Sequence, residues 1–139
     1  MSTRDPLESV EAIEPPENPF KGKTGLTRVF HAFLNSCAAL EDAFRHENAF
    51  RQEIVLAVIL IPTAFVLKVS AVERAMLVAS VLLVLVVELL NTGVEAAIDR
   101  ISYERHALSK RAKDMGSAAV LVALVLLACV WAIIVLPLL

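Results

Sequence analysis

The stretch AMLVASVLLVLVVELLNTGVEAAIDR, residues 75–100, decides the fold, because it is an apolar run whose second half carries three carboxylates and an asparagine. These polar residues, here called the polar stripe, are Glu88, Asn91, Glu95 and Asp99. At 100° per residue in an α-helix, the four side chains fall within a sector of about 80°. A charged side chain at the centre of a bilayer costs about 2.5–3.5 kcal/mol on insertion scales. We therefore expect a transmembrane helix at about 72–99 whose polar stripe faces protein or water, not lipid.

The composition of the whole chain places this helix in a membrane protein. Of the 139 residues, 58% are apolar without counting glycine, whereas soluble domains reach about 45–50% with glycine included. The mean hydropathy is +0.69. A soluble domain of this size buries too little surface to cover so much apolar area, so lipid must cover the excess. We expect an all-α membrane protein.

Two further segments are apolar enough to cross a bilayer. Residues 54–67 carry no charge, and apolar residues before them extend the segment to a first transmembrane helix at about 50–68, which Pro62 should kink or end. Residues 115–139 also carry no charge and predict a last transmembrane helix at about 115–138. The intervening residues 101–114 are mostly polar and predict a loop.

The N-terminal part of the chain differs from these spans. In residues 25–48, apolar side chains recur at helical spacing beside charged ones, which predicts an amphipathic helix on the membrane surface. Residues 1–19 contain five acids and four prolines, a composition typical of disorder. We expect a disordered tail at 1–19 and a single membrane domain at 20–139.

The distribution of lysine and arginine predicts the orientation. Five lie at 20–53, two between the first and second spans, five at 100–113, and none after residue 113. Because positive residues stay on the cytoplasmic side, we expect the N-terminus, the surface helix and the 101–114 loop to be cytoplasmic. The multi-pass chain then ends outside.

The polar stripe also indicates an assembly. Two other membrane helices are too few to enclose it, so we expect a homo-oligomer with sites between subunits. The stripe runs from the cytosol into the acyl region, where a water-soluble reagent and a lipid headgroup can meet. Side chains of the 101–114 loop suit phosphate oxygens: Arg105, His106, Lys110, Arg111 and Lys113.

Three classes of function fit these features. The first is an enzyme that acts on a membrane lipid, and the second is a small oligomeric cation or proton conductor, for which aligned intramembrane acids are also typical. The third is a structural assembly factor. KGKTGLT at 21–27 is similar to the end of a P-loop, but Glu17 stands where the first glycine belongs. We expect no nucleic-acid partner.

Three blocks of sequence resemble the bacterial diacylglycerol kinase family: ENAFRQE at 47–53, VELLNTGVEAAIDR at 87–100 and LSKRAKDMGSAAV at 108–120. Members of that family are small three-helix integral membrane enzymes. The resemblance implies ATP- and Mg²⁺-dependent phosphorylation of the free hydroxyl of diacylglycerol to phosphatidic acid. It also implies a homotrimer with composite sites in the cytoplasmic (inner) membrane of a bacterium. A related branch acts on undecaprenol, which stays open as an alternative substrate.

The resemblance also implies roles for single residues. Glu88 is expected to be the catalytic base, and Glu47 and Glu95 are expected to hold Mg²⁺. Asn91 and Asp99 are expected to support the site. Contacts with ATP are expected from Arg28, Asn35, Glu47, Glu95, Glu104, Arg105, His106, Lys113 and Asp114. Contacts with the lipid are expected from Arg28, Ala49, Phe50, Arg51, Gln52, Glu53, Glu88 and Ser117.

Overall fold

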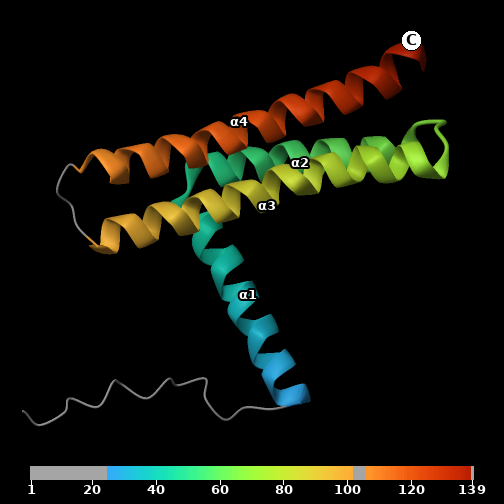
Figure 1. The fold of residues 1–139 in the computed structure, drawn as a ribbon. Helices are drawn as coiled ribbons and strands as arrows, with labels where there is room; N and C mark the ends of the chain where they lie inside the picture. The colour runs from blue at the N-terminus through green and yellow to red at the C-terminus, as the bar shows by residue number, and fades with distance from the viewer. Residues whose placement is uncertain (1–24, 102–105, 139) are drawn as a thin grey trace, which may run out of the picture. The chain divides into compact units, whose positions relative to one another are not determined.

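The computed structural model describes residues 25–101 and 106–138 (Figure 1). Within these ranges the secondary structure is helical, as the sequence predicts. The elements are α1 (Leu26–His46), α2 (Asn48–Val66), α3 (Ala71–Ile101), α4 (Ala107–Val135) and a final 3₁₀ turn, η1 (Leu136–Leu138). The chain divides into two compact units between Cys37 and Ala38, so residues up to Cys37 are described by themselves. The predicted disordered tail lies outside the described residues.

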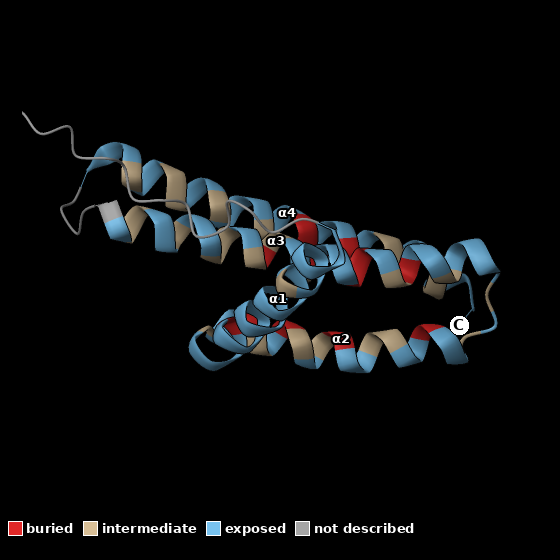
Figure 2. Ribbon diagram, turned by 90° about the horizontal axis from the view of Figure 1, so that it is seen from below, coloured by how far each residue is buried: buried red, intermediate tan, exposed pale blue. Residues whose placement is uncertain are grey.

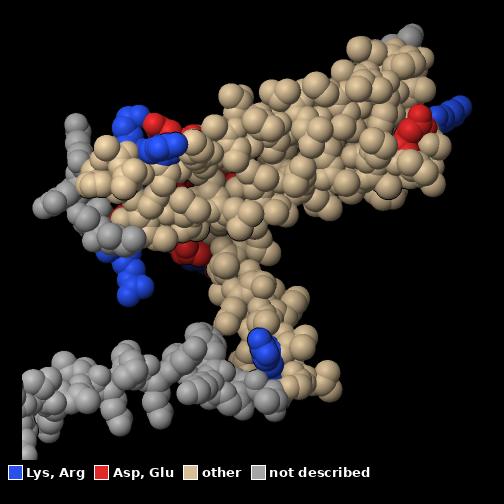
Figure 3. All heavy atoms as spheres, viewed as in Figure 1, with Lys and Arg blue, Asp and Glu red and all other residues tan. Residues whose placement is uncertain are grey.

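Helices α2, α3 and α4 are each long and apolar enough to cross a membrane, which confirms the three expected spans. Helix α3 packs against both α2 and α4. In the view of Figure 3, charged side chains gather at the two ends of these helices and leave an uncharged band between the ends. That distribution matches a bilayer, whose centre excludes charge and whose interfaces admit it.

The start of α4 differs from the sequence prediction. The polar segment expected to be a loop up to residue 114 is helical from Ala107 onward, so Lys110 and Lys113 lie on the first two turns of α4. Polarity misled the prediction, because Leu, Lys, Arg and Ala all have high helix propensity whether or not lipid surrounds them. His106 stands at the N-cap, where its side chain accepts a hydrogen bond of 3.2 Å from the Leu108 N–H.

A single residue separates α1 from α2. Glu47 has extended backbone angles, φ −102° and ψ 116°, and its carboxylate makes no capping hydrogen bond. Arg51, one turn into α2, donates from Nη1 to the carbonyls of Phe44 (3.1 Å) and Arg45 (2.8 Å) at the end of α1. These carbonyls lack helical donors, so Arg51 satisfies them and fixes the turn at Glu47.

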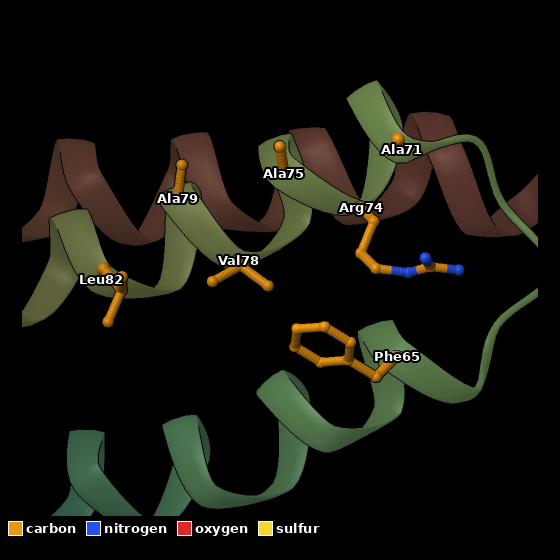
Figure 4. A pocket seen from close by; sticks show the side chains of 7 residues that line it. All are labelled: Phe65, Ala71, Arg74, Ala75, Val78, Ala79 and Leu82. Carbon is orange, nitrogen blue, oxygen red and sulfur yellow. The ribbon is translucent and has the colours of Figure 1, made fainter.

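The opposite end of α2 is closed by Arg74 of α3. Pro62 does not end α2, which continues for one more turn to Val66. Arg74 Nε donates to the Ala64 carbonyl (3.1 Å), and Nη2 donates to the carbonyls of Leu67 (3.3 Å) and Val69 (3.5 Å). Figure 4 shows the Arg74 side chain opposite the Phe65 ring across a groove between α2 and α3, with Cζ 5.9 Å from the ring centroid.

The buried cluster at the centre of the three-helix bundle is small and consists mostly of alanine and valine. It joins Ala57 of α2, Val81 and Val84 of α3, and Ala123 and Leu127 of α4. Small residues at helix interfaces let backbones approach closely in a membrane. Figure 2 shows that most of the surface of each helix is exposed within the single chain. These apolar faces suit contact with lipid or with further subunits.

Candidate active site

The polar stripe of α3 faces protein, as expected from the cost of exposing it to lipid. Glu88 is only 5% exposed, although it stands in an apolar stretch of the helix. Asn91, Glu95 and Asp99 are half-buried. Within one chain Glu88 is therefore sheltered, whereas Asn91, Glu95 and Asp99 are only partly covered.

Helix α2 brings a second carboxylate to the level of Glu88. The α2 helix has nineteen residues and runs antiparallel to α3, so the nineteenth residue of α3, Leu89, returns to the level of Asn48. The Glu47 turn therefore lies beside the deep end of the polar stripe. Because the Glu47 carboxylate caps no helix, it is free for other contacts.

Two carboxylates, Glu53 and Glu88, are buried on the packed helices α2 and α3. Glu53 of α2 is 8% exposed, and its Oε2 has no hydrogen-bond partner among the described residues. Glu88, on α3, is 5% exposed, so a second acid is buried in the same bundle. Like charges held together in apolar surroundings are stabilised by a cation or a shared proton. The arrangement is suited to binding positive charge.

Asn91 connects the polar stripe to α4. Its Nδ2 donates a hydrogen bond of 3.1 Å to Glu95 Oε1. Its Oδ1 is buried and has no partner within the described part of the chain. The carboxamide lies against Gly116 of α4, where any side chain would collide with it. Asn91 thus orients one carboxylate oxygen of Glu95.

The basic residues meet the far end of the stripe. Lys113 Nζ donates to Asp99 Oδ1 at 2.6 Å, and Lys110 Nζ donates to Asp114 Oδ2 at 2.5 Å. His106 begins α4 at the same end. These residues are here called the polar end of the bundle, and Figure 3 shows charged side chains gathered at an end of the helices. Three residues expected to contact ATP therefore lie at one end of α4, namely His106, Lys113 and Asp114.

Several of the expected residues lie elsewhere. Glu104 and Arg105 lie outside the described residues. Arg28 and Asn35 belong to the unit that ends at Cys37, which is described apart from the polar stripe. The side chains of these residues are therefore not placed against the carboxylates.

The segment expected to contact the lipid has two faces. Ala49 and Gln52 are exposed, whereas Phe50 is 2% exposed and Glu53 is 8% exposed. Ser117 is exposed on α4, directly after Gly116. The sequence reasoning missed Gly116, although a glycine inside a predicted helix is a known sign of close backbone approach.

The carboxylates fit a magnesium ion that is held jointly with a phosphate ligand. Among the described residues, no group of three or more His, Cys, Asp and Glu side chains is arranged to hold a metal alone. Mg²⁺ usually binds through one or two carboxylates while phosphates and waters complete its octahedron. Glu47 and Glu95 are the two carboxylates that could supply such a pair of oxygen ligands.

Comparison with known proteins identifies relatives over most of the chain. The family described as prokaryotic diacylglycerol kinase matches residues 34–135. A diacylglycerol kinase of Pseudomonas aeruginosa is 56% identical over 119 residues, which cover 86% of this chain and 97% of the relative. The diacylglycerol kinase of Escherichia coli strain K12 is 47% identical over 110 residues, 79% of this chain and 90% of the relative. That of Helicobacter pylori strain 26695 is 40% identical over 115 residues, 83% and 89% of the two chains.

Proposed function

Because this chain belongs to the prokaryotic diacylglycerol kinase family, we propose that it transfers the γ-phosphoryl group of ATP to the free hydroxyl of diacylglycerol. The product is phosphatidic acid. The observation that carries the proposal is the burial of Glu88, which is 5% exposed among other carboxylates, inside a family match that spans the whole polar stripe. A buried acid in a membrane helix marks a functional site by default.

Glu88 acts as the general base. Its carboxylate takes the proton of the lipid hydroxyl while the hydroxyl oxygen forms a bond to the γ-phosphorus. The bond from that phosphorus to the β–γ bridging oxygen breaks, and ADP leaves. Glu88 is the deepest acid of the stripe on α3, which is where a base for a lipid hydroxyl is needed. Phosphoryl transfer otherwise depends mostly on positioning and charge neutralisation.

Glu47 and Glu95 would hold Mg²⁺, with ATP as the co-substrate. When bound, the ion would supply neutralisation of phosphate charge. The chain contributes one carboxylate from the turn before α2 and one from α3, and Asn91 orients the second through its hydrogen bond to Glu95 Oε1. Because the two ligands come from different elements, the metal site depends on correct packing of α2 against α3.

The polar end of the bundle holds the nucleotide. Lys113 neutralises phosphate charge, and Asp99 keeps its ammonium group in place through the 2.6 Å ion pair. The remaining nucleotide contacts come from Arg28, Asn35, Glu104, Arg105, His106 and Asp114. The lipid is held by Arg28, the segment Ala49 to Glu53, Glu88 and Ser117.

The active enzyme is a homotrimer in the inner membrane, with each site completed by a neighbouring subunit. The half-buried state of Asn91, Glu95 and Asp99 supports this assembly, because one chain leaves part of the stripe uncovered. The surface helix and the start of α4 lie on the cytoplasmic side, where ATP is found. The lysine and arginine distribution supports that orientation.

A substrate panel tests the proposal. The purified protein is given γ-labelled ATP and Mg²⁺ in mixed micelles with diacylglycerol, with undecaprenol or with no lipid acceptor. We expect labelled phosphatidic acid, and much slower labelling of undecaprenol. Faster turnover of undecaprenol reverses the substrate assignment. If the protein phosphorylates no lipid but carries cations across vesicle membranes, the kinase assignment is wrong and the protein is a cation conductor.

A further inference from the structure

Helices α3 and α4 approach closely where Asn91 meets Gly116. A Cβ atom at Gly116 would overlap the Asn91 carboxamide oxygen, and it would lie 3.1 Å from Asn91 Cγ and 3.8 Å from Asn91 Cβ. The carboxamide thus occupies the space that any other residue at position 116 would need for its side chain. The contact lies two residues from Asp114 on α4 and four residues from Glu95 on α3.

The backbone gives no reason for glycine at this position. Gly116 lies inside α4, and within the described residues the only glycine with a positive φ is Gly25. Glycine in a helix interior destabilises the helix by about 1 kcal/mol relative to alanine. The chain tolerates this cost at a point where the three atoms nearest to a Cβ all belong to Asn91. Gly116 is therefore explained by the Asn91 side chain.

Packing also replaces a hydrogen bond in holding the Asn91 carboxamide. Its Nδ2 donates to Glu95 Oε1 at 3.1 Å, but its buried Oδ1 has no partner in the described part of the chain. A buried amide with one unpaired end is free to turn unless its surroundings confine it. The Gly116 backbone is the surface that confines the oxygen end.

We propose that Gly116 is a positioning residue for Glu95, which acts by leaving room for the Asn91 carboxamide between α3 and α4. The Asn91 amide donates a hydrogen bond to Oε1 of Glu95 and so fixes the orientation of the carboxylate toward a divalent ion. This inference rests on the proposed role of Glu95 as a magnesium ligand. A larger residue at position 116 displaces the amide, and Glu95 loses its fixed orientation. Mutation of a residue that hydrogen-bonds to a metal ligand typically weakens metal binding about 10–100-fold.

The test compares five purified proteins in mixed micelles: the parent, Gly116→Ala, Asn91→Ala, the double variant and Gly93→Ala. Gly93 is the matched control, because a Cβ there meets nothing within 4 Å although it lies on α3 between Asn91 and Glu95. Binding of Mn²⁺ with a non-hydrolysable ATP analogue is measured from the paramagnetic resonance of free Mn²⁺. The Mg²⁺ dependence of lipid phosphorylation and the KM for diacylglycerol are measured in parallel.

We expect Gly116→Ala to weaken Mn²⁺ binding about 10–100-fold and to raise the half-saturating Mg²⁺ concentration in the same proportion. The KM for diacylglycerol and the affinity of Gly93→Ala for Mn²⁺ should match the parent. Parental Mn²⁺ affinity in a folded Gly116→Ala protein overturns the inference, since a purely structural glycine changes stability without changing metal affinity.

The double variant can still test the inference if Gly116→Ala alone fails to fold. Asn91→Ala removes the carboxamide that collides with the added methyl group, so the double variant has no clash. If Gly116 acts through Asn91, the two changes are not additive, and the double variant binds Mn²⁺ like Asn91→Ala. A further loss of affinity in the double variant overturns the inference.

A Glu95→Gln protein separates this inference from the proposed function. If Glu95→Gln loses Mn²⁺ affinity and Gly116→Ala does not, only the positioning role of Gly116 is wrong. If Glu95→Gln binds Mn²⁺ like the parent, Glu95 is not a ligand and the inference falls with that assignment.

Discussion

Lys113 Nζ on α4 lies 2.6 Å from Asp99 Oδ1 on α3, so an ion pair joins these two helices at the polar end of the bundle. The two side chains are 37% and 45% exposed. Half-exposed pairs of this kind contribute at most about 1 kcal/mol to stability. The main effect of the ion pair is therefore to fix the position of the Lys113 ammonium group, and it contributes little to the stability of the fold.

Replacing Lys113 with alanine should raise the KM for ATP about tenfold or more, because a charge-assisted contact to phosphate contributes more than about 1.5 kcal/mol. The change in unfolding free energy should stay below about 1 kcal/mol. Steady-state kinetics and unfolding in micelles measure the two effects. Lys68→Ala is the control, because it removes one positive charge from the connection between α2 and α3. An unchanged KM for ATP in Lys113→Ala excludes the lysine as a nucleotide contact.

Glu88→Gln should lower kcat for diacylglycerol phosphorylation about 10²–10⁴-fold, the usual contribution of a general base. Binding of the non-hydrolysable ATP analogue should be retained, since the base contacts the lipid hydroxyl and not the nucleotide. Glu53→Gln is the comparison, because Glu53 is equally buried beside Glu88 but is assigned to lipid binding. It should raise the KM for diacylglycerol more than it lowers kcat. A Glu88→Gln enzyme with normal kcat would refute the base assignment.

The fold was largely predictable because it follows from the positions of long uncharged runs in the sequence. Long uncharged runs cross bilayers whatever they pack against, so the three spans follow from the sequence. The boundaries at the polar ends were harder to predict. The start of α4 at Ala107 and the single-residue turn at Glu47 depend on capping and helix propensity, which charge patterns do not reveal.

The sequence predicted the polar stripe of the candidate site, but it did not predict which residues of α2 and α4 lie opposite the stripe. Helical geometry alone aligns Glu88 with Glu95, but it does not say which residues of α2 and α4 lie opposite. In a membrane helix, apolar residues face both lipid and protein, so hydrophobic periodicity does not fix the register between helices. The burial of Phe50 and the contact of Asn91 with Gly116 are consequences of that register.

Arg74→Ala should destabilise the protein by about 2 kcal/mol, because hydrogen bonds from a charged group contribute about 1.5–3 kcal/mol. Arg74 donates to three carbonyls where α2 ends, and the alanine variant leaves them without this donor. Thermal unfolding in micelles measures the loss. Lys68→Ala in the same connection should change stability little. Equal effects of the two variants would mean that water satisfies these carbonyls.

Ala123→Leu should destabilise the bundle by about 1–3 kcal/mol, the usual cost of overpacking a filled core. Ala123 is 5% exposed and meets Val81 and Val84, which are each 2% exposed, so an added isobutyl group has no space without separating α3 from α4. Ala128→Leu makes the same change at an exposed position of the same helix and should leave the unfolding free energy within about 0.5 kcal/mol of the parent. Unfolding of both variants in mixed micelles tests the pair. If Ala123→Leu is as stable as Ala128→Leu, the close packing of α4 on α3 does not hold the bundle together, and the contact of Asn91 with Gly116 loses its structural support.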